Sequence, residues 1–177
     1  MKKQDIFTLS IILITLVLVR PIFNIPNFNP IGAVALMGGF LFRNKRMAFV
    51  ITLGALFVGD ILMGLSSPIY MDYMFSATFL LVYLSFGMII LIGSSMKNKI
   101  SLLKVVVGSL VSAVLFFLLT NAGSWMTLGY EKSLNGLLLA YEAGVPFFRA
   151  SLVSQLVFSI GIYIVYNLAT NKKTVLA

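Results

Sequence analysis

Residues 20–42 read RPIFNIPNFNPIGAVALMGGFLF, and they decide how the whole chain is interpreted. Three prolines and three asparagines lie within residues 20–30, and the apolar run 31–42 follows them. As a helix this run is only about 18 Å long at about 1.5 Å per residue, too short for a hydrocarbon core of about 30 Å. Either it is packed inside a soluble core, or a loop enters the membrane and the short helix completes the crossing. The second alternative requires surrounding protein or a cavity.

The composition decides between these alternatives. Of the 177 residues, 60% are hydrophobic and 10% are charged, whereas a soluble domain is about 25% charged. We therefore expect an all-α polytopic membrane protein that forms a single integral membrane domain over residues 1–177, with a re-entrant-like loop before its short second helix. The net charge of +8 does not indicate a nucleic-acid partner, because the basic residues lie at the ends of apolar runs.

Several kinds of chemistry find no support in the sequence. The chain has no cysteine and no histidine, which removes disulfides, thiolate catalysis and the commonest zinc ligands. No phosphate-binding loop, dinucleotide fingerprint or nucleophile elbow is present. We expect no metal, no cofactor and no enzymatic activity.

Six apolar runs are predicted to be transmembrane helices. They are residues 6–19, 31–42, 47–63, 75–92, 103–119 and 147–168. The first resembles a signal peptide, but Arg20 and Pro21 stand where the small residues of a cleavage site would be, so we expect an uncleaved helix. Small residues four apart in three of the runs predict close helix contacts. These pairs are Ala35 with Gly39, Ala55 with Gly59, and Gly108 with Ser112.

The connection 121–146 has its own amphipathic segment, because apolar residues recur at helical spacing from Leu134 to Tyr141. Ser133 is predicted to cap this segment, and Gly144-Val145-Pro146 to end it. We expect a short helix over the outer face, either an interfacial helix without function or a lid.

The basic residues predict the orientation. Ten of the 13 Lys and Arg residues lie at the N-terminus, at the C-terminus and in the connections 43–46 and 97–104. The other three, Arg20, Lys132 and Arg149, fall on the opposite side. The positive-inside rule then places both termini in the cytoplasm of a multi-pass protein of the inner (plasma) membrane, in contact with the lipid bilayer.

Asp60 is the most informative single residue. A charge inside a transmembrane helix costs about 2.5–3.5 kcal/mol on insertion scales and usually faces the bundle interior or a cavity. Counting about 1.5 Å per residue places Asp60 at the same outer level as Arg20, Asn121 and Arg149. Three interpretations remain open: an ion pair with an arginine that ties helices together, a substrate site that Asp60, Arg20 and Arg149 surround, or simple exposure of Asp60 at the membrane interface.

Other residues near this level complete the predicted site. Asn29 is a predicted N-cap with Pro30 at the first helical position, so the positive end of the short helix would point into the same region. The outer aromatic residues either anchor the protein at the membrane surface or stack on a planar ligand. The predicted substrate-binding residues are Arg20, Asn27, Asn29, Asp60, Asn121, Trp125, Tyr141 and Arg149.

Several stretches resemble an uncharacterised family of small bacterial membrane proteins. They are NFNPIGAVAL at 27–36, Gly59-Asp60, TNAGSW at 120–125, and Tyr141 with VPFF at 145–148. The arrangement as a whole resembles the substrate-binding S components of energy-coupling factor (ECF) vitamin transporters. That resemblance implies a six-helix fold with a plug-like loop and a small-molecule site open to the outside. It also implies uptake driven by a separate module of two ATPases and a transmembrane scaffold.

One departure concerns the partner. S components often carry an Ala-x-x-x-Ala surface on their first helix for the scaffold, and residues 6–19 have no such pair. Coupling to an ECF module and solitary action both stay open. The function expected is uptake of a small, vitamin-like solute through an outward-facing pocket. The alternative is a non-transporting scaffold or assembly subunit whose outer polar cluster is structural.

Overall fold

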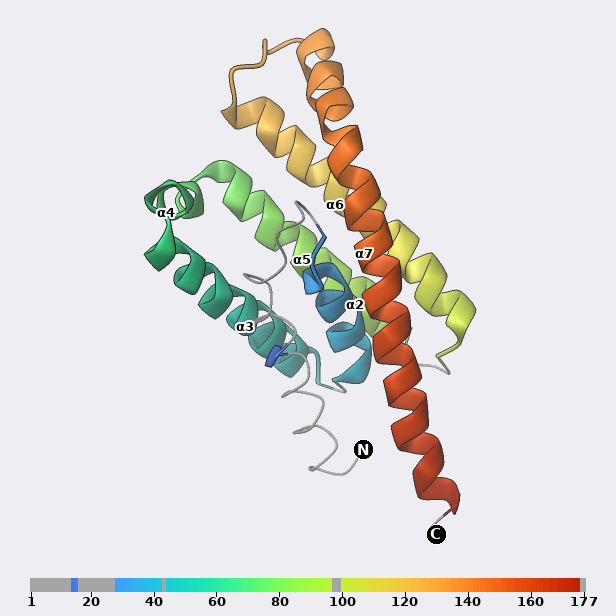
Figure 1. Cartoon of the computed structure of the whole chain (residues 1–177). Coiled ribbons are helices and arrows are strands. Elements are labelled where there is room, and N and C mark those ends of the chain that lie inside the picture. The colour runs from blue at the N-terminus through green and yellow to red at the C-terminus, as the bar shows by residue number, and fades with distance from the viewer. Residues whose placement is uncertain (1–13, 16–27, 43, 97–99, 176–177) are drawn as a thin grey trace.

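The structure is a computed structural model that describes residues 14–15, 28–42, 44–96 and 100–175 (Figure 1). The described part is helical and contains no strand. Its helices are α2 (Ile31–Leu41), α3 (Lys45–Ser66), α4 (Pro68–Met74), α5 (Ala77–Ser95), α6 (Leu102–Thr127) and α7 (Leu134–Val175). Most of the predicted helix 6–19, together with Arg20 and Asn27, lies outside the described residues.

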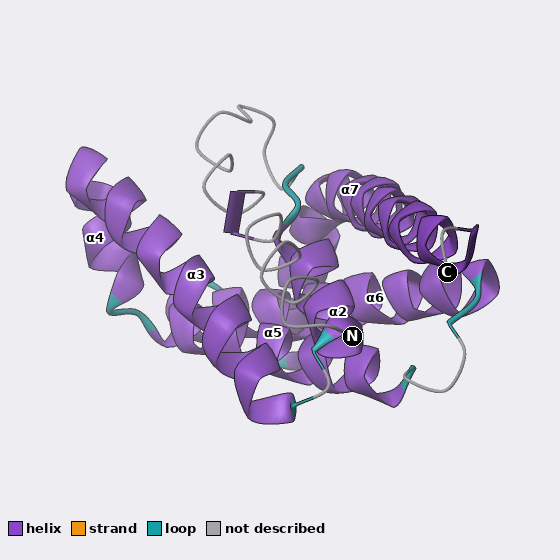
Figure 2. Cartoon of the chain, turned by 90° about the horizontal axis from the view of Figure 1, so that it is seen from below, coloured by secondary structure: helices purple, strands orange, loops and turns teal. Residues whose placement is uncertain are grey.

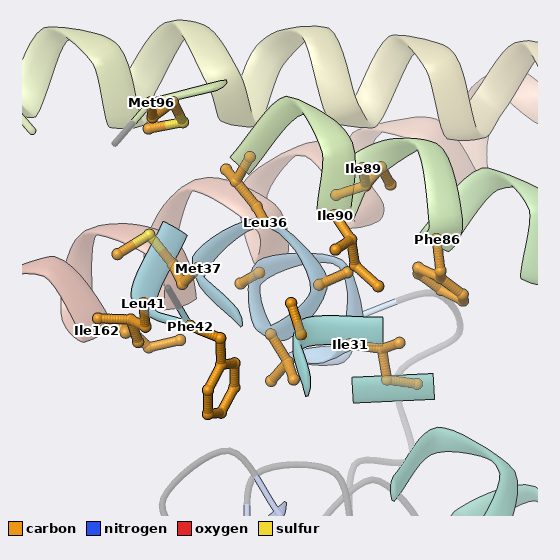
Figure 3. Packing of buried hydrophobic residues seen from close by; sticks show 14 of the residues in the cluster. Ile31, Leu36, Met37, Leu41, Phe42, Phe86, Ile89, Ile90, Met96 and Ile162 are labelled. Carbon is orange, nitrogen blue, oxygen red and sulfur yellow. The ribbon is translucent and has the colours of Figure 1, made fainter. Parts of the chain in front are cut away.

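The short helix α2 lies at the centre of the molecule, with α3 and α7 on either side of it and α5 packed against it (Figures 1 and 2). All of its residues except Gly32 and Phe40 are buried. Leu36 and Met37 of α2 pack with Ile90 of α5 in a continuous apolar core (Figure 3). A helix that is apolar on all sides has no face for water, so central burial is the arrangement its sequence favours.

The longer helices surround this core and expose apolar side chains outward. Val50 of α3, Leu80 of α5 and Leu103 of α6 are 72%, 70% and 71% exposed. Such surfaces are typical of contact with lipid rather than water. Four helices, α3, α5, α6 and α7, are long and apolar enough to cross a membrane. These findings support the prediction of an all-helical protein with several membrane-spanning helices.

One predicted helix end is wrong because polar side chains continue the helix. The run 103–119 was expected to end before Asn121, yet α6 continues to Thr127. Its polar side chains bond to the carbonyl four residues earlier: the Thr120 hydroxyl donates to Phe116 at 2.8 Å and the Thr127 hydroxyl to Gly123 at 2.9 Å. Because these hydroxyl groups find hydrogen-bond acceptors within the helix itself, the helix can continue through the polar residues.

The predicted stop at Gly144-Val145-Pro146 is also wrong. Helix α7 runs without interruption through Pro146, so the amphipathic segment is the beginning of α7 rather than a separate helix over the outer face (Figure 1). The predicted cap is confirmed, since the Ser133 hydroxyl accepts from the Gly136 N–H at 3.2 Å. Membrane helices tolerate an internal proline where neighbours take up the freed backbone groups. The connection between α6 and α7 is therefore only residues 128–133.

The short helix α4 was not predicted. Ser67 caps it by accepting from the Tyr70 N–H at 3.3 Å, and Pro68 occupies its first turn. This helix turns the chain between α3 and α5 and presents two tyrosines, Tyr70 and Tyr73, to the interior.

Candidate functional site

A cavity of about 130 Å³ lies where the described helices converge, at the end of the bundle that carries α4. Every helix from α2 to α7 contributes to its wall. The aromatic part of the wall comes from Tyr70 and Tyr73 of α4, Phe79 and Phe86 of α5, and Phe116 of α6. The polar part is formed by Asn29, Gly32, Asp60, Ser112, Ser151 and Gln155. Aromatic walls with a few convergent polar groups are typical of a small-molecule site.

Asp60 lies on the wall of this cavity and is only 2% exposed. The hydroxyl of Tyr70 donates to its Oδ1 at 2.6 Å, and the hydroxyl of Tyr83 donates to its Oδ2 at 2.6 Å. These short bonds join α3 to α4 and to α5. They also direct the carboxylate, since hydrogen bonds to a carboxylate are about twice as strong as those between neutral groups.

Another part of the wall is formed by the first turn of α2 and by two side chains from α6 and α7. Gln155 Nε2 and Ser112 Oγ are buried and have no hydrogen-bond partner within the described structure. The Gln155 amide lies directly on Gly32: a Cβ at position 32 would be 2.0 Å from its Oε1. The chain leading into α2 is fixed to α7 here, because the Ser154 hydroxyl donates to the Asn29 carbonyl.

The N-cap of α2 differs slightly from the prediction. Pro30 is the N-cap, one residue after the predicted position, but the Asn29 side chain still accepts from the Ile31 N–H at 3.2 Å. The N-terminus of α2 does point toward the cavity that Asp60 lines, since Gly32 forms part of both.

A second, more open cavity of about 350 Å³ lies beside the first, between α5, α6 and α7. The two cavities share Tyr73, Val82, Phe116 and Ser151 as lining residues. The two cavities are therefore adjacent, and the first is the more enclosed of the two.

Asn121 and Tyr141, two of the predicted site residues, lie near this second cavity. Asn121 lines it, and its Nδ2 donates to the Phe117 carbonyl at 2.8 Å. Tyr141 lines neither cavity, and its hydroxyl donates to the Leu118 carbonyl at 3.0 Å. In both cases the polar atom is engaged by the backbone of α6.

Trp125 and Arg149 lie outside both cavities. Trp125 Nε1 donates to the Glu131 carbonyl at 2.9 Å, and Lys132 Nζ lies 5.6 Å from the centroid of its ring. Arg149 is exposed, contrary to the prediction that it shares the cavity of Asp60. Of the predicted site residues that the structure describes, only Asn29 and Asp60 meet in the enclosed cavity.

One family model covers almost the whole chain, with a match over residues 1–176. The chain belongs to DUF6580, a family of unknown function. It matches no curated protein and no solved structure. The site of this DUF6580 protein therefore has to be interpreted from its own residues.

The bonds of the two tyrosines to Asp60 and the place of Ser112 in the wall were not predicted from the sequence. Tyr70 was one of the outer aromatic residues expected either to anchor the protein or to stack on a ligand, and Ser112 was expected at a helix contact. Gln155 was expected at the depth of the cavity floor, but as a hydrogen-bond partner of another helix. A signal existed for Tyr70, because Ser67-Pro68 predicts a new helix start that would bring it back toward α3. No such signal existed for Ser112 of this DUF6580 protein. The depth of Gln155 in an apolar run was a signal for that residue, but nothing local to either residue shows that the two share a wall.

Proposed function

We propose that this protein binds a small solute in the enclosed cavity and takes part in its uptake, as an S-component-like membrane protein. The observation that carries the proposal is the cavity itself: it combines an aromatic wall, a buried carboxylate and two buried polar groups without partners among the described residues. Each unpaired buried group costs about 1–3 kcal/mol. Thr52, Ser109 and Ser159 also lack partners in the described structure, but Ser112 and Gln155 line a cavity in which a ligand can supply one.

The proposed topology has six spans, with both termini in the cytoplasm of a bacterial inner membrane. It combines α2, α3, α5, α6 and α7 with the run 6–19. The cavity then opens outward, because it lies at the end of the bundle opposite the exposed basic residues Lys45, Arg46 and Lys104. A cysteine placed at position 132 of this cysteine-free chain tests the orientation. Labelling by an impermeant reagent from the cytoplasmic side alone would reverse it.

The first test of binding is to purify the protein from cells grown in rich medium and identify the co-purified solute by mass spectrometry. The Asp60→Asn variant then distinguishes a binding role from a structural one. If Asp60 orients the solute, the variant binds about ten- to a hundredfold more weakly, the equivalent of about 1.5–3 kcal/mol for a charge-assisted hydrogen bond. Its unfolding temperature should fall only moderately, because a neutral amide still bonds to the tyrosines but more weakly than a carboxylate. The loss of binding is then larger than the loss of stability accounts for.

The energy source is tested separately. The resemblance to S components suggests an ATPase and scaffold module as partner, whereas the run 6–19 lacks the alanine pair expected for that contact. Expression in a host without such a module separates the two possibilities. Accumulation of the solute in that host would rule out an obligatory module.

A second candidate function is a non-transporting scaffold or assembly subunit. It is favoured by one observation, the bonding of both Asp60 oxygens to tyrosines of neighbouring helices, which is what a structural clamp requires. In that case Asp60→Asn lowers the unfolding temperature, and no solute co-purifies with the wild-type protein.

A further inference from the structure

The wall of the enclosed cavity around the first turn of α2 has an unusual concentration of hydrogen-bond donors. The first intrahelical bond of α2 joins the Val34 N–H to the Pro30 carbonyl at 2.9 Å. The N–H groups of Ile31, Gly32 and Ala33 therefore precede the helix ladder, and Asn29 takes up the one from Ile31. This end of the helix dipole favours an electronegative atom.

Two side chains add independent evidence that this end of α2 receives a ligand. Gln155 is 5% exposed and Ser112 is fully buried, yet Gln155 Nε2 and Ser112 Oγ have no partner in the described structure. Both residues line the cavity, from α7 and α6 respectively. Buried polar groups are nearly always hydrogen-bonded, so two on one wall indicate that a third group completes them.

Other unpartnered hydroxyls provide a contrast. Ser109 and Ser159 are as deeply buried as Ser112 and also lack partners among the described residues. They lie on the same two helices, but neither lines the cavity. Ser109 lies three residues before Ser112, and Ser159 lies four residues after Gln155. Each is a matched control for its neighbour.

From this arrangement we propose that the solute is a single planar ring with an sp² oxygen, a carbonyl or a carboxylate, which is held by the first turn of α2, Gln155 and Ser112. The ring fits the volume, since an apolar cavity of about 150 Å³ holds one benzene and this cavity is about 130 Å³. Phe79, Phe86 and Phe116 offer it aromatic faces and edges. The oxygen accepts hydrogen bonds from Ser112 Oγ and Gln155 Nε2, which have no acceptor in the described structure.

This proposal rests on the proposed binding of a solute in the cavity, but it does not require that the protein transports the solute. The test uses the full chain in lipid nanodiscs, with binding to empty nanodiscs subtracted. Three probes of nearly equal size are compared: benzamide with a neutral carbonyl, benzoate with a carboxylate, and aniline with N–H groups but no oxygen. We expect benzamide or benzoate to bind about tenfold or more tightly than aniline, and the better of the two identifies the kind of oxygen.

The variants Ser112→Ala and Gln155→Met then remove the proposed donors one at a time. Each should weaken the preferred probe about three- to tenfold, the loss of one hydrogen bond, and leave aniline unchanged. The controls Ser109→Ala and Ser159→Ala should stay within about twofold of wild type. The unfolding temperature of every variant is measured alongside, so that a loss of folding is not counted as a loss of binding.

Each result has one consequence. Equal binding of all three probes, binding of none of them, or an equal loss in the serine controls overturns the proposed oxygen subsite. If the subsite behaves as expected but no solute enters cells that express the protein, the uptake function fails and the subsite stands. If uptake occurs without dependence on Ser112 and Gln155, the subsite alone fails.

Discussion

Each end of the short helix α2 has a glycine in a close contact, but the two contacts differ in kind. Near its C-terminal end, Gly39 lies against the backbone of α5, where an added Cβ would be 2.1 Å from the Ile90 carbonyl oxygen. Near its N-terminal end, Gly32 lies against the end of the Gln155 side chain. The first neighbour is rigid backbone and the second is a flexible amide.

This difference separates the part of the molecule that fixes the fold from the part that can adapt to a ligand. At the Gly39 end the helices approach so closely that Gly93 of α5 meets the Leu36 carbonyl in return, and the Ser94 hydroxyl donates to the Gly39 carbonyl at 3.2 Å. The predicted pair of Ala35 and Gly39 is thus part of a close helix contact. At the Gly32 end polar groups converge on a cavity instead.

The largest expected effect is at the packed end. Gly39→Ala should destabilise the protein by about 3 kcal/mol or more, the upper part of the range for overpacking, because α2 and α5 would have to separate. The measurement is the unfolding midpoint in detergent micelles. Gly54→Ala and Gly161→Ala are the matched controls, since an added Cβ at either position meets no atom of the described residues within 4 Å.

These controls should be neutral or more stable by about 0.5–1 kcal/mol, the ordinary gain when alanine replaces glycine in a helix. A Gly39→Ala variant as stable as the controls would contradict the backbone contact between α2 and α5.

The second prediction concerns Asp60, which lines the cavity and is hydrogen-bonded to tyrosines of α4 and α5. Tyr83→Phe removes one of the two tyrosine hydrogen bonds to Asp60 and should lower the free energy of unfolding by about 1.5–3 kcal/mol, the usual worth of a hydrogen bond to a charged group. Tyr163→Phe is a suitable control, because Tyr163 is also half-buried and its hydroxyl has no hydrogen bond in the described part of the chain. Equal unfolding midpoints for the two variants would show that the hydrogen bond from Tyr83 to Asp60 does not contribute to stability.

The third prediction has the opposite sign. Gln155→Met keeps the length of the side chain but removes a buried donor that has no partner in the part of the chain that the structure describes, so the unliganded protein should become more stable by about 1 kcal/mol. A residue kept only for stability would lose stability on this change. A gain in stability together with weaker solute binding is the combination expected of a functional group.

Sequence alone predicted the packed end of α2 better than the cavity. The bounds 31–42 agree with Ile31–Leu41 to within one residue, because Pro30 marks the start and the apolar run is continuous. The burial of Asp60 was expected because a charge within an apolar run avoids lipid. Both are local properties of the chain.

The cavity depends on which helix faces meet, and local patterns do not contain that information. Helices α5 and α6 are apolar around most of their circumference, so no periodicity shows which side faces inward. Tyr83 reaches Asp60 across 23 residues, and Ser112 shares a wall with Gln155 from another helix. Arg149 was assigned from its depth alone, and depth does not fix the direction in which a side chain points.

The smallest expected effect on stability returns to Gly32. Gly32→Ala gains about 0.5–1 kcal/mol of helix preference but pushes the Gln155 amide aside, so the two contributions should nearly cancel. A double-mutant cycle with Gln155→Ala separates them: in that background Gly32→Ala should show the full gain, because the clashing amide is absent. Solute binding should nonetheless fall in the single variant, since the new methyl group occupies the place where the amide and the first turn of α2 meet. If Gly32→Ala instead destabilised the protein as much as Gly39→Ala, the N-terminal end of α2 would be as rigidly packed as the other end, and the distinction between a fixed end and an adaptable one would be lost.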